Sequence, residues 1–526
     1  MPIFNDEIIQ KIFGKEDAEN EEPTRLKEYF FRNKAYQNLT SNLAIRILVG
    51  HKGSGKSALL RVAHNEDNAR QIVSLWLRPD DVRAVVPHVA TGDLNARIES
   101  WKKALTLLIA REVATHYCDN AASLIEAEKT RGYVRDIITM AREWFSNEIN
   151  QGLAKVHRPV IESFLKNNVI RIYLDDLDRG WEATKTDITN ISALLNALRD
   201  ICGHGNNLQF RLGLRSDVYY LVRTSDESTD KIEANLIFLN WINHDILIVA
   251  AKRIESFFGR TIDEGALVNA RQPQVARYLE PVIEPRFQGA GKWENVPVHR
   301  VLLSMVRHRP RDLVKLLSGA ARAAFQKDHE IITSGDLRET FESYSNERMQ
   351  DLINEFRTEF PEIQKLLRGM KPSKRVMHTI EEFAFSNDRL VVKLKNLMSQ
   401  ARFLFTNGTP VNVHSLAQFL YKIDFLIARK RMPNGEIVRK FFDQNRYLND
   451  QFVDFGFDWE IHPAYRWALQ PADPLGILNV TELDSDDVDE IGKSITLQAP
   501  PANATPATST NSNVRLIKRG SPKASG

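Results

Sequence analysis

The amino-acid sequence predicts an α/β protein with a three-layer core, because three apolar stretches each end abruptly in polar residues. Residues 44–49 lead through a glycine-rich turn into a helix, and residues 169–174 end in three carboxylates within four positions. Residues 208–214 alternate in polarity and break at Arg215. Ligands of open α/β sheets bind at the carboxyl ends of the strands, so these polar strand ends predict one shared site.

The composition is that of a globular protein with two or three domains. The chain has 526 residues, 43% of them hydrophobic and 26% charged. A formal net charge of +3 gives no bulk electrostatic reason to expect nucleic acid. Only Cys118 and Cys202 occur, without metal-ligand spacing, which suits a reducing compartment. With no secretory signal and no long apolar run, we expect a cytoplasmic location and no membrane contact.

The turn after the first strand reads GHKGSGKS and fits the phosphate-loop pattern G-x-x-x-x-G-K-[ST] at every fixed position. Its glycines permit backbone angles that turn successive N–H groups toward phosphate oxygens, and the following helix adds its positive end. Lys56 then reaches the β- and γ-phosphates, and the Ser57 hydroxyl ligates Mg²⁺. The predicted nucleotide-binding residues are Gly50, His51, Lys52, Gly53, Ser54, Gly55, Lys56, Ser57 and Ala58.

The acidic end of the second strand supplies the complementary chemistry. A neighbouring strand of a phosphate-binding fold brings an acid to the metal, so we expect Asp175 to hold Mg²⁺ directly or through water. Asp176 is then predicted to orient or deprotonate the attacking water. We expect Asp178 and Arg179 to do no more than pair with each other.

Two arginines are candidates for contact with the γ-phosphate. Arg215 ends the third strand, where it either senses the phosphate or forms an ordinary surface pair with Asp217. Arg311 follows Pro310 at a predicted helix start, where it either swings over bound nucleotide from a helical lid or is a surface arginine near a cap.

Taken together, these motifs resemble the KAP-type P-loop ATPases, especially bacterial members without membrane helices near the STAND and AAA+ groups. The resemblance covers roughly residues 20–345 and rests on the phosphate loop, IYLDDLDRG, FLNWINHDILIVAAKRI and RHRPRDLVKLL. It implies ATP as the nucleotide, Arg215 as first sensor and Arg311 as the sensor of a helical lid. It also implies an additional strand between the loop strand and the acid strand, for which residues 71–79 are the candidate. Relatives of this kind are associated with anti-phage defence.

The rest of the chain divides by composition. In the N-terminal segment, Tyr29, Phe30, Phe31 and Tyr36 are expected to pack near the adenine side of the core. The predicted divisions are an approach segment 1–40, a P-loop core 41–260 with a helical insertion 92–166, a helical lid 261–345, a helical linker region 346–400, a winged-helix-like domain 401–470 and a disordered tail 482–526.

The winged-helix-like domain is predicted from a helix followed by two strands around Pro433-Asn434-Gly435. Its basic residues either contact nucleic-acid phosphates or form a solvated wing in a module for protein contacts, and we favour the second. They are Lys422, Arg429, Lys430, Arg431, Arg439 and Lys440. Partner contact or self-assembly is expected through this domain and the insertion. His462 is expected to be a packed or capping residue.

These features predict a Mg²⁺-dependent ATPase that drives a conformational switch or an assembly. Two alternatives stay open from the sequence. One is an adaptor that binds nucleotide without hydrolysing it, and the other is a nucleic-acid-binding regulator that uses residues 401–470.

Overall fold

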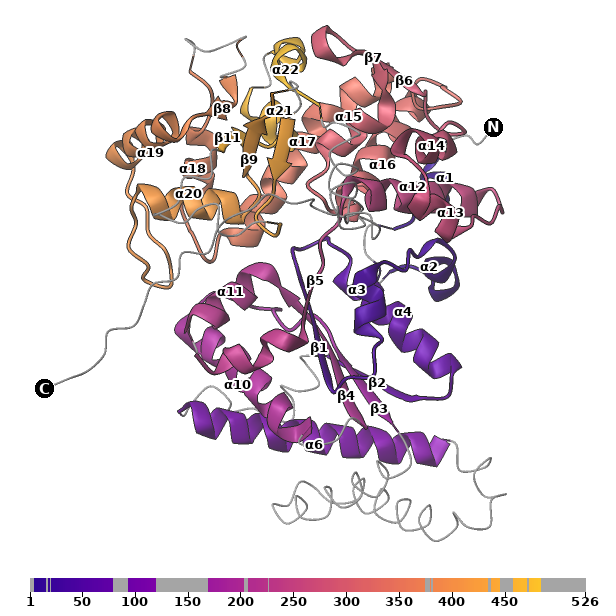
Figure 1. Ribbon diagram of the computed structural model, residues 1–526, viewed down its shortest axis with the longest axis vertical. Helices are drawn as coiled ribbons and strands as arrows, with labels where there is room; N and C mark the ends of the chain where they lie inside the picture. The colour runs from indigo at the N-terminus through magenta and orange to yellow at the C-terminus, as the bar shows by residue number, and fades with distance from the viewer. Residues whose placement is uncertain are drawn as a thin grey trace, which may run out of the picture. The chain divides into compact units, whose positions relative to one another are not determined.

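The computed structural model describes residues 4–15, 18, 20–78, 93–119, 169–202, 207–225, 227–373, 379, 382–433, 437–444, 457–470 and 473–483 (Figure 1). A five-stranded, fully parallel sheet lies at the centre of the N-terminal half, which confirms the predicted α/β class. Its strands are β1 (Ile45–Gly50), β2 (Val73–Leu77), β3 (Ile170–Leu174), β4 (Leu208–Arg215) and β5 (Leu236–Phe238).

The sheet order is β2-β3-β4-β1-β5, so β4 is the strand between the phosphate-loop strand β1 and the acid strand β3. The prediction of residues 71–79 as this additional strand was wrong, because β2 pairs only with β3 at the sheet edge. The burial of the two strands explains why β4, and not β2, lies inside the sheet. Seven of the eight residues of β4 are buried, as both faces of a central parallel strand must be, whereas β2 alternates between buried and half-buried residues.

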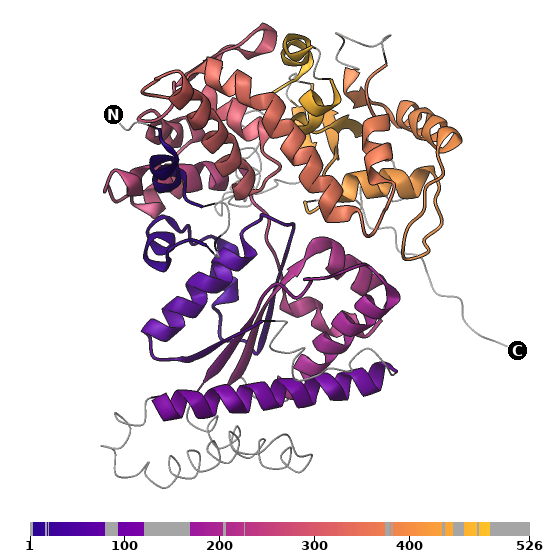
Figure 2. The same ribbon diagram turned by 180° about the vertical axis from the view of Figure 1, so that it is seen from behind.

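Helices cover both faces of this sheet (Figures 1 and 2). α4 (Lys56–Ala69) packs on one face, and α10 (Lys185–Cys202) and α11 (Ser216–Ser225) pack on the other. α6 (Leu94–Asp119) lies against α10 and buries Leu105 and Ile109 there. The first part of the predicted insertion therefore belongs to the core layers, and residues 120–166 lie outside the described residues.

Helices of the N-terminal segment pack against helices of the predicted lid. α1 packs against both α12 and α16, and α16 packs along α17. The helices of this region are α1 (Asp6–Phe13), α2 (Pro23–Tyr29), α3 (Lys34–Leu39), α12 (Asn243–Phe257), α13 (Glu264–Asn269), α14 (Gln272–Ala276), α15 (Val298–Met305), α16 (Pro310–Gln326) and α17 (Ser334–Phe356). Strands β6 (Arg286–Gln288) and β7 (Glu294–Pro297) form a small hairpin beside them.

The C-terminal part forms an antiparallel sheet of order β10-β9-β11-β8 with helices beside it. The hairpin of β9 and β10 forms at the predicted place, whereas β8 and α19 lie before residue 401, the predicted start of the domain. The elements are α18 (Ile363–Gly369), β8 (Ala384–Phe385), α19 (Asn387–Gln400), α20 (Val413–Lys422), β9 (Leu426–Arg431), β10 (Ile437–Lys440), β11 (Asp458–Ile461), α21 (Arg466–Leu469) and α22 (Pro474–Val480). We call β8 to β11 with α19 and α20 the winged-helix-like module.

The predicted start of the disordered tail at residue 482 was wrong. Glu482 is buried, accepts hydrogen bonds from Lys292 and Arg431 and pairs with Arg429. Burial alone would raise the pKa of Glu482, but these three cations outweigh it and lower the pKa to about 2. The acidic composition predicted a solvated tail, because a sequence does not show that an acid will pair with arginines in the folded protein. Residues 484–526 lie outside the described residues.

Within the described part of the chain, no helix combines the length and the apolar character needed to cross a lipid bilayer.

A buried charge network fixes α4 to β3 and yields a stability prediction. Asp67 of α4 accepts hydrogen bonds from Arg171 and from the Tyr173 hydroxyl (2.6 Å) and is only 2% exposed. Asp67→Ala leaves the Arg171 guanidinium buried without its carboxylate, so we expect a loss of about 3–5 kcal/mol in the free energy of unfolding, measured by urea titration.

Asp200→Ala is the control, because Asp200 belongs to an exposed pair with Lys102 at 3.7 Å. Its loss should stay below about 1 kcal/mol. Equal losses for the two variants would contradict the role of the buried network.

Candidate active site

The phosphate loop follows β1 and closes on itself. Gly53 and Gly55 have φ angles of +81° and +94°, which side-chain-bearing residues rarely adopt. Gly55 caps α4, which begins at Lys56. The Lys56 Nζ donates hydrogen bonds to the carbonyls of Gly50 (2.9 Å) and His51 (3.0 Å). Burial lowers the pKa of Lys56, while the carboxylates of Asp178 and Asp175 oppose that shift.

Trp241, which sequence reasoning did not single out, packs against the phosphate loop and donates a hydrogen bond to it. Its indole Nε1 donates a 2.7 Å hydrogen bond to the Ser54 carbonyl, and its ring lies next to Gly55. The available signal was a single tryptophan directly after the apolar strand β5. A buried indole N–H needs an acceptor, and the Ser54 carbonyl of the tight loop provides one.

Asp175 and Asp176 leave the end of β3 in different directions. Asp175 is buried, and its carboxylate fits beside Gly213 of β4, where an added Cβ would lie 2.8 Å from Oδ1. Asp176 is exposed and has a left-handed φ of +59°. Both residues line the cavity next to the phosphate loop. The sheet therefore brings the predicted acids to the predicted lysine.

The predicted magnesium ligands fit a divalent cation. The Asp175 Oδ2 is buried without a hydrogen-bond partner, and the Ser57 side chain lines the same cavity. Among the described residues no group of three His, Cys, Asp or Glu side chains is arranged to hold a metal ion. Magnesium bound with nucleotide needs only one or two protein ligands, because phosphates and water complete its coordination.

Arg215 stands at the end of β4, directly beside Gly50 of β1 in the sheet register. It forms a two-pronged pair with Asp217 (2.7 and 3.0 Å) and contacts Asp178 at 3.2 Å. Asp178 therefore pairs with Arg215 rather than with Arg179 alone as expected. Burial would lower the pKa of Arg215, but the surrounding carboxylates, including Glu355, raise it above its ordinary value. The arginine is a fixed cation at the cavity rim.

Arg311 reaches the loop from the first turn of α16. Its Cβ and Cδ would lie 3.2 Å from a Cβ added to Gly53, so a side chain at position 53 would press against the arginine. Arg309, which sequence reasoning missed, is 2% exposed and donates to the Lys52 carbonyl at 3.3 Å. Two arginines of the RHRPRD segment thus touch adjacent loop residues.

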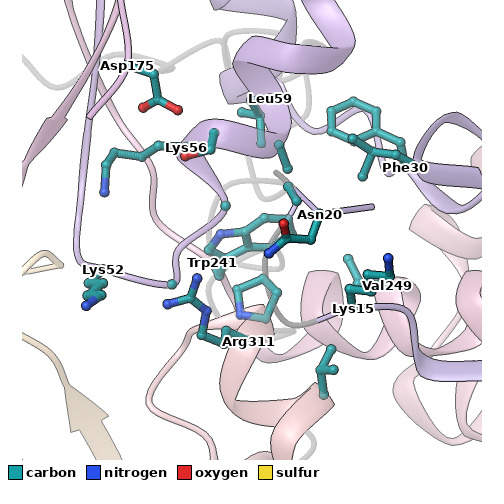
Figure 3. A pocket seen from close by; sticks show the side chains of 18 of the residues that line it. Lys15, Asn20, Phe30, Lys52, Lys56, Leu59, Asp175, Trp241, Val249 and Arg311 are labelled. Atoms are coloured by element: carbon teal, nitrogen blue, oxygen red, sulfur yellow. The ribbon is translucent and has the colours of Figure 1, made fainter. Parts of the chain in front are cut away.

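The cavity bounded by these residues has a volume of about 530 Å³. Lys56, Asp175, Trp241 and Arg311 surround it (Figure 3). Its other end is lined by Tyr29, Phe30, Phe31, Val249 and Val314, so three of the four N-terminal aromatics lie where a base could stack. Among the predicted loop residues, those that line the cavity are Lys52, Gly53, Gly55, Lys56, Ser57 and Ala58.

The His51 side chain does not face this cavity. It is buried on the opposite side of the loop, with Nε2 3.3 Å from Asp424 and 3.2 Å from Asp443. The pattern predicted a loop position, and only the tertiary structure decides which way a variable side chain points.

The basic residues of the hairpin divide between buried and exposed positions, and several of them are paired with carboxylates. Arg429 and Arg439 are buried against Glu460, and Lys422 pairs with Glu359 at 2.7 Å. Arg431 binds Glu482, and Lys430 lies over the Phe457 ring. Most of the charge that suggested phosphate contact is therefore neutralised inside the protein. His462 is buried and accepts a hydrogen bond from the Ala464 N–H, in agreement with the capping role expected for it.

The sheet order and this site define a P-loop NTPase fold of the additional-strand class. Residues 283–353, which include α15 and α16, match the FunZ-associated C-terminal helical domain. The chain is also similar to the transposon gamma-delta 80.3 kDa protein of Escherichia coli K12, with 23% identity over 91% of this chain and 69% of that protein. It is 25% identical to the allergen Alt a 2 of Alternaria alternata over 32% of this chain and 80% of the allergen.

Two solved structures illustrate a loose likeness in fold. The Aeropyrum pernix ORC2 protein has a TM-score of 0.35 and 9% identity over 90% of this chain and 93% of its own. Cdc6p from Pyrobaculum aerophilum has a TM-score of 0.29 and 12% identity over 87% of this chain and 97% of its own. Structural similarity at this level does not indicate function. The function is therefore inferred from the geometry of the site.

The close approach of β3 and β4 yields a prediction about the acid. In Gly213→Ala the new methyl would lie 2.8 Å from the Asp175 Oδ1 and 3.2 Å from Leu60, so the carboxylate must move. We expect Mg²⁺-dependent binding of a fluorescent ATP analogue to weaken at least about tenfold, as for loss of one charge-assisted contact. The measurement is a titration with and without EDTA.

Gly335→Ala is the control, because the nearest neighbour of its added Cβ is 3.5 Å away. Unchanged binding by Gly213→Ala would contradict the placement of Asp175 as a metal ligand.

Proposed function

We propose that this protein is a Mg²⁺-dependent ATPase that uses ATP to drive a conformational switch or an assembly. The single observation that supports this most strongly is the convergence of Lys56, Ser57, Asp175 and Asp176 on one cavity beside the phosphate loop. ATP rather than GTP rests on the resemblance to KAP-type ATPases, since the sequence offers no N-K-x-D-like guanine reader. Membership of that group and a role in anti-phage defence stay predictions.

Each residue of the site has a separate role in the proposed reaction. Loop N–H groups and Lys56 bind the β- and γ-phosphates, for which the Lys56 ammonium leaves the two loop carbonyls that it now contacts. Ser57 and Asp175 would hold Mg²⁺, which supplies charge neutralisation for the phosphates. Asp176 orients the water and accepts its proton. Arg215 and Arg311 stabilise the charge that develops on the γ-phosphate.

The fixed charge around Arg215 favours catalysis over simple nucleotide storage. Three carboxylates hold its guanidinium in place, so it needs no reorganisation when phosphate charge shifts during hydrolysis. A non-hydrolysing adaptor has no use for an exposed acid such as Asp176 at the cavity. Arg215 and Asp176 therefore favour an ATPase over an adaptor that binds nucleotide without hydrolysing it.

Turnover tests the proposal. We expect Lys56→Ala and Asp176→Asn each to lower the steady-state rate of phosphate release at least about 10²-fold, the scale of losing one preorganised electrostatic contact. Lys395→Ala and Asp388→Asn, which alter exposed residues of α19, serve as matched controls and should keep the wild-type rate. Equal and negligible release by the wild type and Asp176→Asn would favour the adaptor.

A further inference from the structure

The face of the phosphate loop that points away from the cavity is covered by the winged-helix-like module. His51 of the loop lies against Asp424, which precedes β9, and Asp443, which follows β10. The side chains of His51 and Asp424 are only 6% and 4% exposed. The space left between these surfaces is about 20 Å³, room for about one water molecule. The module therefore touches the loop directly.

A second buried contact runs through Arg309. Its guanidinium donates to the Lys52 carbonyl at 3.3 Å and to the Asp424 Oδ2 at 3.2 Å. Asp424 thus reaches two consecutive loop residues, His51 by its own carboxylate and Lys52 through Arg309.

The same network continues to the sensor arginine. The Glu355 carboxylate of α17 lies 3.6 Å from Arg309 and 3.9 Å from Arg215. Lys422, at the end of α20, pairs with Glu359 just after α17 at 2.7 Å. The loop, the sensor strand, the lid and the module are therefore joined by charged side chains with little access to water.

This interface is polar and incompletely satisfied. The His51 ring nitrogens, the Asp424 Oδ1 and the Arg309 Nε are buried without a well-directed hydrogen bond. Each such atom costs about 1–3 kcal/mol relative to water, which offsets part of the stabilisation that this contact provides. Apolar contacts flank this polar patch, since Phe442 packs on Tyr220 of α11 and Phe419 packs on Phe356 of α17. The part of the interface that can respond to a change at the loop is therefore the charged patch around His51.

We propose that the winged-helix-like module is a positioning element of the phosphate loop: Asp424 and Asp443 hold His51, Arg309 holds Lys52, and module docking and nucleotide binding are thereby linked. The inference rests on the proposed function, since it assigns regulation to the same site. A loop held from behind loses less conformational freedom when phosphate binds, so docking strengthens binding. By reciprocity, nucleotide at the loop strengthens docking by the same factor.

The test is a double-mutant cycle on the full chain with a fluorescent ATP analogue and Mg²⁺. We expect His51→Gln and Asp424→Asn each to raise the Kd at least about fivefold, the lower end of ordinary coupling between sites, and the double variant to add nothing further. The KM for ATP should rise with kcat at saturation unchanged, because the contacts position the loop and do not touch reacting atoms. Hydrogen exchange over residues 419–431 should slow when nucleotide is added to wild type and not to the variants.

Asp458→Asn is the matched control, because it makes the same change at an exposed position of β11 in the module. It should bind nucleotide like the wild type. Arg309→Lys is a second variant that keeps the charge and loses the two-pronged contact, and it should behave like Asp424→Asn.

The outcomes separate the two proposals. Wild-type binding with additive or absent effects of His51→Gln and Asp424→Asn would overturn the docking proposal and leave the ATPase intact. Failure of the wild type to bind any nucleotide would overturn the proposed function and this inference with it.

Discussion

The structure depends on holding several charges out of water at the carboxyl edge of one parallel sheet. Lys56, Asp175 and Arg215 follow or flank three adjacent strands, and each is largely buried. Isolated charges would be too costly there, so each must face an opposite charge or a ligand. Arg215 finds its partners among protein carboxylates, whereas Asp175 keeps one oxygen without a partner. Arg215 is thus a cation held in place by the protein, whereas Asp175 has an oxygen that can bind a ligand.

Small residues make this edge possible. Gly213 leaves space for the Asp175 carboxylate, and Gly53 leaves space for Arg311 from the lid. In both places a methyl group would meet a charged side chain from another element at close range. The glycines of the loop thus have two roles, since Gly53 also provides a left-handed backbone angle. Loop conformation and lid contact are consequently set by the same residue.

The C-terminal part of the described chain contacts the phosphate loop directly. Its arginines Arg429, Arg439 and Arg466 converge on Glu460 in a buried cluster, so they stabilise the module's own sheet. Its acids Asp424 and Asp443 are directed to the phosphate loop. Much of the charge that resembled a nucleic-acid surface is therefore paired within the protein, and the side chains that contact the phosphate loop are acidic.

The sequence by itself determined the phosphate loop, the acid strand and the strand that ends at Arg215, because each is a local pattern of neighbouring residues. GHKGSGKS and the carboxylates after residue 174 needed no knowledge of the fold. Tertiary structure alone decided the sheet order, the contacts of Arg215 with Asp178 and Glu355, the orientation of His51 and the burial of Glu482. These depend on contacts between residues far apart in the chain. A sequence does not show whether a charged side chain faces water or a buried partner of opposite charge. Only the packing of the folded chain distinguishes these two environments.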